Sequence, residues 1–565
     1  MPDRGLLGRI TEYGDREFSA FFRRACAKSM GLTDDALGKP IVGIVNTFSE
    51  FNNCHRGLPE LIDAVKRGIW QAGGLPREFP VVSLGEPFLN PSAMMMRNLM
   101  AMDVEVMLTA QPVDAAVLVG GCDKTMPALG MGAASADVPS IALVAGPMLT
   151  GDFDGERVAA CTDCRRFWGK YRRGEIDAET IARVESSLVP TAGTCGVMGT
   201  ASTMACLLEA LGLMLPGGAS IPAVHGERLR HADEVGRCAV ALIGTDRTPA
   251  RLLTEKAFEN AWRVLQAIGG STNAIIHLIA IAGRCGIRLS LDSLDRVSDS
   301  TPLLVDLKPS GQGYMEDFHR AGGMRVVLQE LRPLLHTDVL TVDGRTLGDI
   351  LDKPYEFPSW QNVIRPARAP LSPRGSLIVL RGNLAPEGAI LKRSAASPEL
   401  LRKTGRAVVF QSLEDLAVRI DDPNLDVTPD DILVLQNAGP LGGPGMHEAG
   451  ALPIPKKLAG VRDMVRISDA RMSGTAFGTV VLHVAPEAAA GGPLGLVRTG
   501  DRIALDAERR TLELLVDPRE LDARRAQPRI GPTVTRGYAW LYQQTVQQAH
   551  LGADFDFLRH ESLRG

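Results

Sequence analysis

The stretch VLVGGCDKTMPALGMGAASADVP, residues 117–139, begins as a buried strand and ends that strand on two glycines. A thiol, a carboxylate and an amine follow directly, in Cys122, Asp123 and Lys124. Ligands of open α/β sheets bind at the carboxyl ends of the strands. Three reactive groups at this point therefore predict a functional site.

Strand-like and helix-like segments alternate on both sides of this stretch. The segments that read as helices are 57–74 and 92–110, and those that read as strands are 39–46, 79–87, 113–121 and 138–146. Such alternation predicts a mainly parallel sheet with helices on both faces.

The sequence pattern changes after a segment with five prolines, residues 353–375. Short β runs with turn residues between them follow, which predicts a β-rich barrel or sandwich with few helices. We therefore expect an α/β protein with two domains: a mainly parallel α/β domain over residues 1–370 and a β-rich, barrel-like domain over residues 371–565.

Composition narrows the class of protein. The 565 residues carry 62 Lys and Arg against 66 Asp and Glu, for a net charge of −4. Because no basic, aromatic-studded face is present, we expect no nucleic-acid partner. The first residues lack an apolar signal region and no apolar run is long enough to span a bilayer, so the expected location is the cytoplasm, without a membrane partner.

Nine cysteines are scattered along the chain, an odd number that does not describe a disulfide framework. Cys54, Cys122 and Cys195 share a polar or Gly-rich loop context, in which thiolates could hold an iron–sulfur cluster. Their spacings of 68 and 73 residues match no local metal motif. Cys161 and Cys164 have the spacing of a zinc site, but no second pair accompanies them and an incidental origin is favoured.

Oxygen and nitrogen side chains offer further chemistry. Glu86, Asp123 and Glu448 stand on Gly- or Pro-rich loops, where carboxylates suit Mg²⁺. Lys124 could be a surface amine, a phosphate binder or a modified residue. Ser473, in a Gly-flanked turn, is a plausible nucleophile or base, although no His or Asp partner is evident.

Six motifs in order carry a family resemblance that runs from about residue 39 to about residue 540. They are GGCDKTMPALGMGAAS, GTCGVMGTASTMACLLEALGLMLPG, GGSTNAIIHLIAIA, LRGNLAPEGAILK, GGPGMHEA and ISDARMSGTAFG. Together they resemble the dihydroxy-acid dehydratase/6-phosphogluconate dehydratase family. The segments around Cys54 and Glu86 are most similar to its sugar-acid branch, which acts on pentonates such as arabinonate and xylonate. Asn53 stands where the branched-chain amino-acid enzymes usually carry proline.

The resemblance implies a set of site residues. Cys54, Cys122 and Cys195 match the ligands of a [2Fe–2S] cluster, and three cysteines leave one iron with an open position. The residues that match the Mg²⁺ site are Glu86, Asp123, Glu448 and Lys124, the last as a carbamate. Ser473 matches the proposed catalytic base, and Thr475 beside it could help to orient substrate.

The resemblance also implies the reaction: loss of water from a 2,3-dihydroxy sugar acid, a small molecule, to give the 2-keto-3-deoxy acid. Tyr314, Glu316 and His319 are candidates to bind the sugar hydroxyls. His55 and His447 flank proposed ligands and could donate hydrogen bonds to them. The family further suggests homodimers or homotetramers and an active site between the two domains.

Two alternatives stay open. The first is dehydration of 2,3-dihydroxy-isovalerate for branched-chain amino-acid synthesis, which would need an apolar pocket in place of polar partners. The second, from a different class, is a non-catalytic iron–sulfur redox sensor. The set of Glu86, Asp123, Lys124, Glu448 and Ser473 argues against a sensor, which does not need a Mg²⁺ site.

Overall fold

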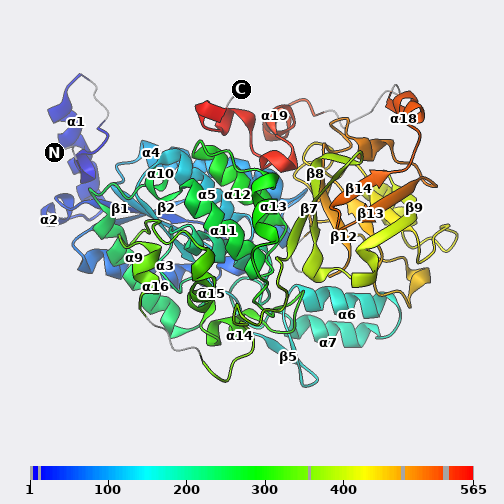
Figure 1. The fold of residues 1–565 in the computed structure, drawn as a ribbon. Helices are drawn as coiled ribbons and strands as arrows, with labels where there is room; N and C mark the ends of the chain where they lie inside the picture. The colour runs from blue at the N-terminus through cyan, green and yellow to red at the C-terminus, as the bar shows by residue number, and fades with distance from the viewer. Residues whose placement is uncertain (1–3, 11–13, 354–357, 473–476, 526–533, 564–565) are drawn as a thin grey trace.

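Four parallel strands form the centre of the N-terminal half of the protein (Figure 1). The computed structural model describes residues 4–10, 14–353, 358–472, 477–525 and 534–563. The strands lie in the order β2-β1-β3-β4. Their bounds are β1 Ile41–Asn46, β2 Leu75–Pro80, β3 Ala115–Gly120 and β4 Ser140–Val144. All three strand pairs are parallel, so all four carboxyl ends lie at one edge of the sheet.

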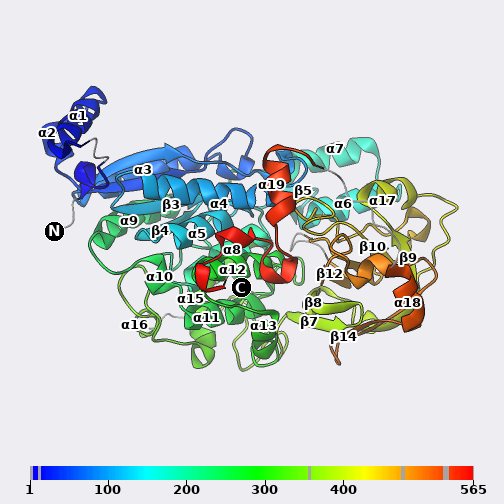
Figure 2. The same cartoon turned by 90° about the horizontal axis from the view of Figure 1, so that it is seen from above.

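Helices cover both faces of this sheet (Figure 2). They pack in two pairs, α3 Leu58–Gln71 with α9 Gly226–Leu242, and α4 Ala93–Ala110 with α5 Thr125–Ala136. The first pair crosses so closely that a Cβ atom on Gly68 would lie 2.0 Å from the carbonyl oxygen of Asp233. Strand β3 is buried along its whole length, as expected of a strand covered on both faces.

Two further helices are buried on every side, α8 Thr200–Ala210 and α12 Asn273–Arg284. The other helices of this half are α1 Arg16–Ser29, α2 Asp34–Leu37, α6 Thr162–Arg172, α7 Ala178–Ser187, α10 Pro249–Leu252, α11 Glu255–Ala267, α13 Leu291–Ser298, α14 Met315–Arg320, α15 Gly323–Leu331 and α16 Leu347–Leu351. A small antiparallel hairpin, β5 Gly151–Phe153 with β6 Glu156–Val158, precedes α6. Within the described residues, no helix is both long and apolar enough to cross a bilayer.

The C-terminal half is built on a closed barrel with the strand order β10-β11-β12-β8-β7-β14-β13-β9. The strand bounds are β7 Leu377–Gly382, β8 Ala385–Lys392, β9 Arg402–Phe410, β10 Ile432–Leu435, β11 Arg466–Ser468, β12 Val480–Ala485, β13 Arg502–Asp506 and β14 Thr511–Leu514. Strands β9 to β12 run parallel to one another. The predicted fold class, a parallel α/β half followed by a barrel-like β half, is confirmed. The division at residue 370 stays a prediction.

The end of the chain joins the two halves (Figure 2). Helices α17 Leu413–Arg419 and α18 Pro518–Arg525 belong to the C-terminal half, whereas α19 Gly537–Thr545 packs against α4, where the hydroxyl of Tyr538 donates to the carbonyl oxygen of Met95 at 2.6 Å. Beyond α19 the chain stays on the N-terminal half, where the buried Arg97 donates to the carbonyl oxygens of Gly552 at 2.8 Å and Ala553 at 2.9 Å. Arg284 forms a buried ion pair with Asp554 at 2.7 Å. These contacts fix the barrel against the α/β half.

One buried charge in the barrel lacks compensation. Lys392, the last residue of β8, is buried, and none of the described residues accepts a hydrogen bond from its Nζ. Burial lowers the pKa of Lys392 from 10.5 to about 7. In the unfolded chain the amine stays charged up to the higher value. Burial of the Lys392 amine therefore costs no stability above about pH 10.5, and this cost grows as the pH falls toward about 7.

We expect Lys392→Met to stabilise the protein at pH 7, because methionine keeps the length of the side chain and removes the desolvated amine. The gain should be a few kcal/mol, since one pKa unit corresponds to about 1.4 kcal/mol. It should shrink as the pH is raised toward 10. Urea denaturation at several pH values measures it, and the exposed Lys256→Met is the control. A gain that does not depend on pH would contradict this account of Lys392.

Candidate active site

Each of the four parallel strands ends beside one segment that the sequence singled out. The segments that follow β1, β2 and β3 carry Cys54, Glu86 and the Cys122–Lys124 turn, respectively. The fourth segment reaches the end of β4 from another part of the chain. There the N–H of Thr194 donates to the carbonyl oxygen of Gly146 at 2.9 Å, and the N–H of Met148 donates to that of Thr194 at 2.8 Å. Cys195, the next residue, is thereby held at the same sheet edge as the others.

The predicted cluster ligands lie together. The thiol of Cys122 shares a hydrogen bond with Cys54, which with burial raises the pKa of Cys122. A hydrogen bond with Cys161, burial, and the nearby thiols of Cys161, Cys54 and Cys122 raise the pKa of Cys195. Deprotonation of such a group requires a cation that takes the place of the protons, as a thiolate-bound metal does. The donor set fits an iron–sulfur cluster, although the structure itself does not test that prediction.

His55 orders the turn that carries Cys122. Its Nε2 accepts the backbone N–H of Cys122 at 3.1 Å, and its Nδ1 lies 2.7 Å from the carbonyl oxygen of Thr47. Burial lowers the pKa of His55 to about 4, so the ring is neutral and donates from Nδ1. His55 thus supports the ligand-bearing turn through its backbone. The similar role expected of His447 stays a prediction.

The three predicted carboxylate ligands surround two buried cations. Nζ of Lys124 lies 2.5 Å from Asp123 Oδ2, 3.6 Å from Glu86 Oε2 and 3.9 Å from Glu448 Oε1. Arg471 donates from Nη2 to Glu86 at 2.6 Å and from Nη1 to Glu448. The side chains of Lys124 and Arg471 are fully buried. We call these five side chains the ion cluster.

The ion cluster connects the two halves of the protein. Glu448 and Arg471 follow β10 and β11, two parallel strands of the barrel. Nη2 of Arg471 also donates to Oγ of Ser92, at the start of α4 in the other half, at 2.9 Å. The expected position of the site between the halves therefore agrees with these contacts. The predicted catalytic residues Ser473 and Thr475 lie outside the described residues.

The electrostatics of the ion cluster act differently on its carboxylates. Burial alone would raise the pKa of Glu86, but Lys124 and Arg471 lower it to about 2. Burial raises the pKa of Asp123, and Glu86 and Glu448 add to that rise. Oε2 of Glu86 is buried without a hydrogen-bond donor among the described residues. A divalent cation would supply the missing partner.

The charge count of the ion cluster also fits the predicted modification of Lys124. Three carboxylates face two cations, which leaves one net negative charge. Conversion of the ammonium to a carbamate removes two units of positive charge, and one Mg²⁺ ion restores them. The charge of the site is then the same with a free lysine as with a carbamate and a bound Mg²⁺. The donor set therefore fits the ion that the sequence predicts.

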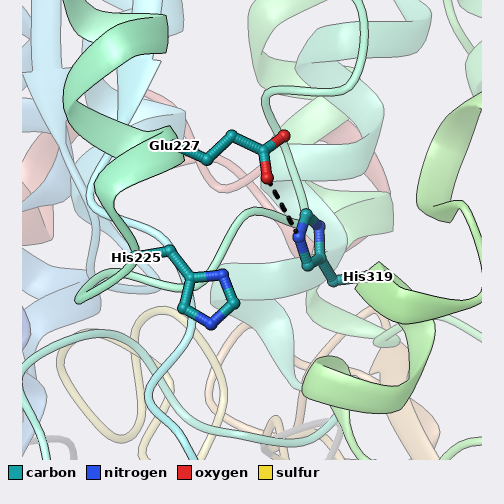
Figure 3. Close-up of side chains that lie close together, drawn as sticks. All are labelled: His225, Glu227 and His319. Carbon is teal, nitrogen blue, oxygen red and sulfur yellow. Dashed lines mark ion pairs between the residues drawn. The ribbon is translucent and has the colours of Figure 1, made fainter.

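The predicted substrate contacts all have protein partners. The hydroxyl of Tyr314 lies 2.9 Å from Asp163 Oδ2 and 2.6 Å from the carbonyl oxygen of Arg157. Glu316 accepts from Thr150 Oγ1 at 3.2 Å. His319 lies beside Glu227 and His225 on the first turn of α9 (Figure 3). Tyr314 belongs to a small apolar cluster with Ala159 and Val197, against which Cys195 packs. Substrate binding by these three residues stays a prediction.

Two residues near the site were not chosen from the sequence. Arg471 stands in the same DARMSG motif as Ser473, but nothing in the motif shows that its guanidinium joins two carboxylates from different halves. Sγ of Cys161 lies 3.0 Å from Sγ of Cys195. The C-x2-C spacing drew attention to Cys161 for a zinc site, whereas the structure pairs it with a predicted cluster ligand.

Comparison with known proteins agrees with this geometry. A profile of the dihydroxy-acid/6-phosphogluconate dehydratase N-terminal domain matches residues 39–350, and the profile of the C-terminal domain matches residues 362–553. The chain belongs to this family. As a member of this family, the protein is a dehydratase, that is, a hydro-lyase.

Several relatives match this dehydratase over nearly its whole length. L-arabonate dehydratase of Azospirillum brasilense is 50% identical over 97% of this chain and 96% of its own. 6-Deoxy-6-sulfo-D-gluconate dehydratase of Pseudomonas putida is 48% identical over 96% and 94%. Dihydroxy-acid dehydratase of Caldicellulosiruptor bescii is 40% identical over 94% and 97%. The predicted resemblance to the family and to its sugar-acid branch is confirmed.

We expect Arg471→Met to destabilise this dehydratase by about 3 kcal/mol, because it leaves two largely buried carboxylates with one shared cation, Lys124, in place of two. Urea denaturation measures the loss. The control is Arg374→Met, which removes a bidentate but exposed pair with Glu508 and should cost no more than about 1 kcal/mol. Equal losses in the two variants would show that Arg471 is not essential to the ion cluster.

Proposed function

We propose that this dehydratase converts a 2,3-dihydroxy sugar acid to its 2-keto-3-deoxy acid. A [2Fe–2S] cluster would be held by Cys54, Cys122 and Cys195. Mg²⁺ would be held by Glu86, Asp123, Glu448 and a carbamylated Lys124. The observation that carries the proposal is the placement of thiols and carboxylates side by side, at the ends of four neighbouring strands.

The two proposed metal sites are close enough to act on one substrate. Cys122 and Asp123 are adjacent, with Sγ of Cys122 3.7 Å from Oδ1 of Asp123. The backbone of Glu86 also hydrogen-bonds the Cys122 thiol. Gly121 allows the backbone to pack this closely, since a Cβ atom there would lie 2.8 Å from that of Ala145. When bound, the cluster would supply a Lewis acid for the departing 3-hydroxyl, and Mg²⁺ would stabilise the charge that forms as C2 loses its proton.

The residues of the chain have distinct tasks in this proposal. Arg471 holds the carboxylates of Glu86 and Glu448 in place. Ser473 would take the proton from C2, with Thr475 beside it orienting the substrate. A serine acts as a base only where a nearby cation stabilises its alkoxide. Arg471 precedes Ser473 by two residues in the sequence.

The sugar-acid assignment rests on the relatives. Three of the relatives at 48–50% identity are named for sugar acids, and relatives at 40% identity are named for dihydroxy acids. Dehydration of 2,3-dihydroxy-isovalerate is therefore the alternative that an assay must separate. We also propose a cytoplasmic enzyme that assembles as a homodimer or homotetramer, as the resemblance implies.

A substrate panel tests the proposal. After anaerobic purification, keto-acid formation is measured from L-arabinonate, a hexonate and 2,3-dihydroxy-isovalerate. We expect turnover of a sugar acid, and turnover of the branched acid alone would overturn the assignment. Chelation of Mg²⁺ should lower the rate by on the order of 100-fold or more, and added Mg²⁺ should restore it.

Cys122→Ser should abolish both the visible absorbance of the cluster and the activity, because it removes a thiolate ligand. Cys238→Ser is the control, since Cys238 lies on α9, away from the strand ends, and should change neither property. Full activity in Cys122→Ser would contradict the proposed cluster site.

A further inference from the structure

A fourth thiol belongs to the group at the strand ends. Cys161 precedes the first residue of α6, and its Sγ lies 3.0 Å from Sγ of Cys195. Cys164, its partner in the C-x2-C spacing, lies one turn further along the helix. The contact with Cys195 shows that Cys161 faces the proposed cluster site, so its position is not incidental.

The four thiols form two pairs. Cys54 shares a hydrogen bond with Cys122, and Cys161 with Cys195. Four thiolates, two on each iron, are the usual ligand set of a [2Fe–2S] cluster. Two thiolates on one tetrahedral ion at about 2.3 Å lie about 3.7 Å from each other, so the second pair would need to open by less than about 1 Å.

We propose that Cys161 is a fourth ligand of the cluster. It caps the iron that Cys54, Cys122 and Cys195 leave incompletely ligated, and it yields that position when substrate binds. This inference rests on the proposed function, which supplies the cluster. It also reconciles a complete thiolate set with chemistry that needs an open position on one iron.

The surroundings of Cys161 link it to the loop expected near substrate. Asp163, two residues on, accepts from the hydroxyl of Tyr314 and from Nζ of Lys308 at 3.1 Å. It also accepts from the N–H of Ala159 at 2.9 Å, which fixes the chain just before Cys161. A shift of Tyr314 or Lys308 on substrate binding would therefore be transmitted to Cys161.

Cys161 lies on a different part of the fold from Cys54 and Cys122. It belongs to the excursion of β5, β6, α6 and α7, which lies outside both the parallel sheet and the barrel (Figure 1). Cys54 and Cys122, by contrast, lie in the segments that follow the sheet strands β1 and β3. Withdrawal of Cys161 would thus leave those two thiols in place.

The test compares the wild type with Cys161→Ser and with Cys164→Ser as the matched control, all loaded with cluster anaerobically. Iron and acid-labile sulfide per chain, the visible spectrum and the electron paramagnetic resonance of the reduced cluster are measured. We expect Cys161→Ser to keep its iron and sulfide but to show shifted spectra, and to lose the cluster several-fold faster in air. Cys164→Ser should match the wild type.

Addition of a turned-over sugar acid should move the wild-type spectra toward those of Cys161→Ser. Identical spectra of Cys161→Ser and the wild type without substrate would overturn the inference and leave the proposed function standing. Absence of iron and sulfide from the wild type would overturn both.

A second group of side chains carries a separate inference. His225, Glu227 and His319 place one ligand atom each within 4.8 Å of one another (Figure 3). Nε2 of His319 lies 3.4 Å from Oε2 of Glu227. The first two residues stand at the start of α9, and the third is on α14. None of them belongs to the thiol group or the ion cluster.

Two imidazoles and one carboxylate form a ligand set for zinc and similar divalent transition ions. We infer that these three residues bind one such ion, with Zn²⁺ as the best match.

Competition of the loaded enzyme with a chromophoric chelator for Zn²⁺ tests this site. We expect one site that weakens at least about 10-fold in His225→Ala and in His319→Ala. His336→Ala is the control, because His336 pairs with Glu259 at 3.2 Å but belongs to no group of three possible ligands among the described residues. Absence of Zn²⁺ binding by the wild type, or equal affinity in all variants, would overturn the inference.

Discussion

The buried guanidinium of Arg471 is the interaction on which the site depends. It contacts Glu86 from the α/β half and Glu448 from the barrel half, and it donates to Ser92 as well. Without this cation, two largely buried carboxylates from different halves would share one cation, Lys124, in place of two. Such an arrangement is strongly unfavourable. Arg471 therefore contributes both to the position of the barrel against the parallel sheet and to the composition of the site.

The two halves of the fold place their reactive groups in the same way. In both halves, parallel strands end at the site, and the turns that follow them carry the polar side chains. The parallel sheet contributes Cys54, Glu86 and the Cys122–Lys124 turn, and the barrel contributes Glu448 and Arg471. Thiols and carboxylates are thereby sorted into neighbouring groups that share the Cys122–Asp123 peptide. This is the arrangement that the proposed two-metal dehydration requires.

Much of this could be predicted from the sequence because the signals are local. The alternation of strands and helices predicted the parallel sheet, and the short β runs predicted the barrel. The turn with Cys122 and Lys124 is contiguous, so its chemistry was visible at once. Cys54 and Cys195 lie 68 and 73 residues from it; their loop context suggested a shared cluster, and the family resemblance implied that they are its ligands.

Other features depend on distant contacts that no local pattern records. The bridge made by Arg471 joins residues 385 positions apart. The pairing of Cys161 with Cys195 depends on how an excursion outside the sheet folds back. Lys392 reads as an ordinary residue at a strand end, and only the closed barrel shows that its amine is buried.

The most direct test of the account is anomalous diffraction at the iron absorption edge, from crystals grown anaerobically with Mg²⁺. The account predicts iron density enclosed by Cys54, Cys122 and Cys195. It also predicts a magnesium ion among Glu86, Asp123 and Glu448, with a carbamate on Lys124. Iron located elsewhere, or an unmodified Lys124 still holding the three carboxylates without Mg²⁺, would contradict it.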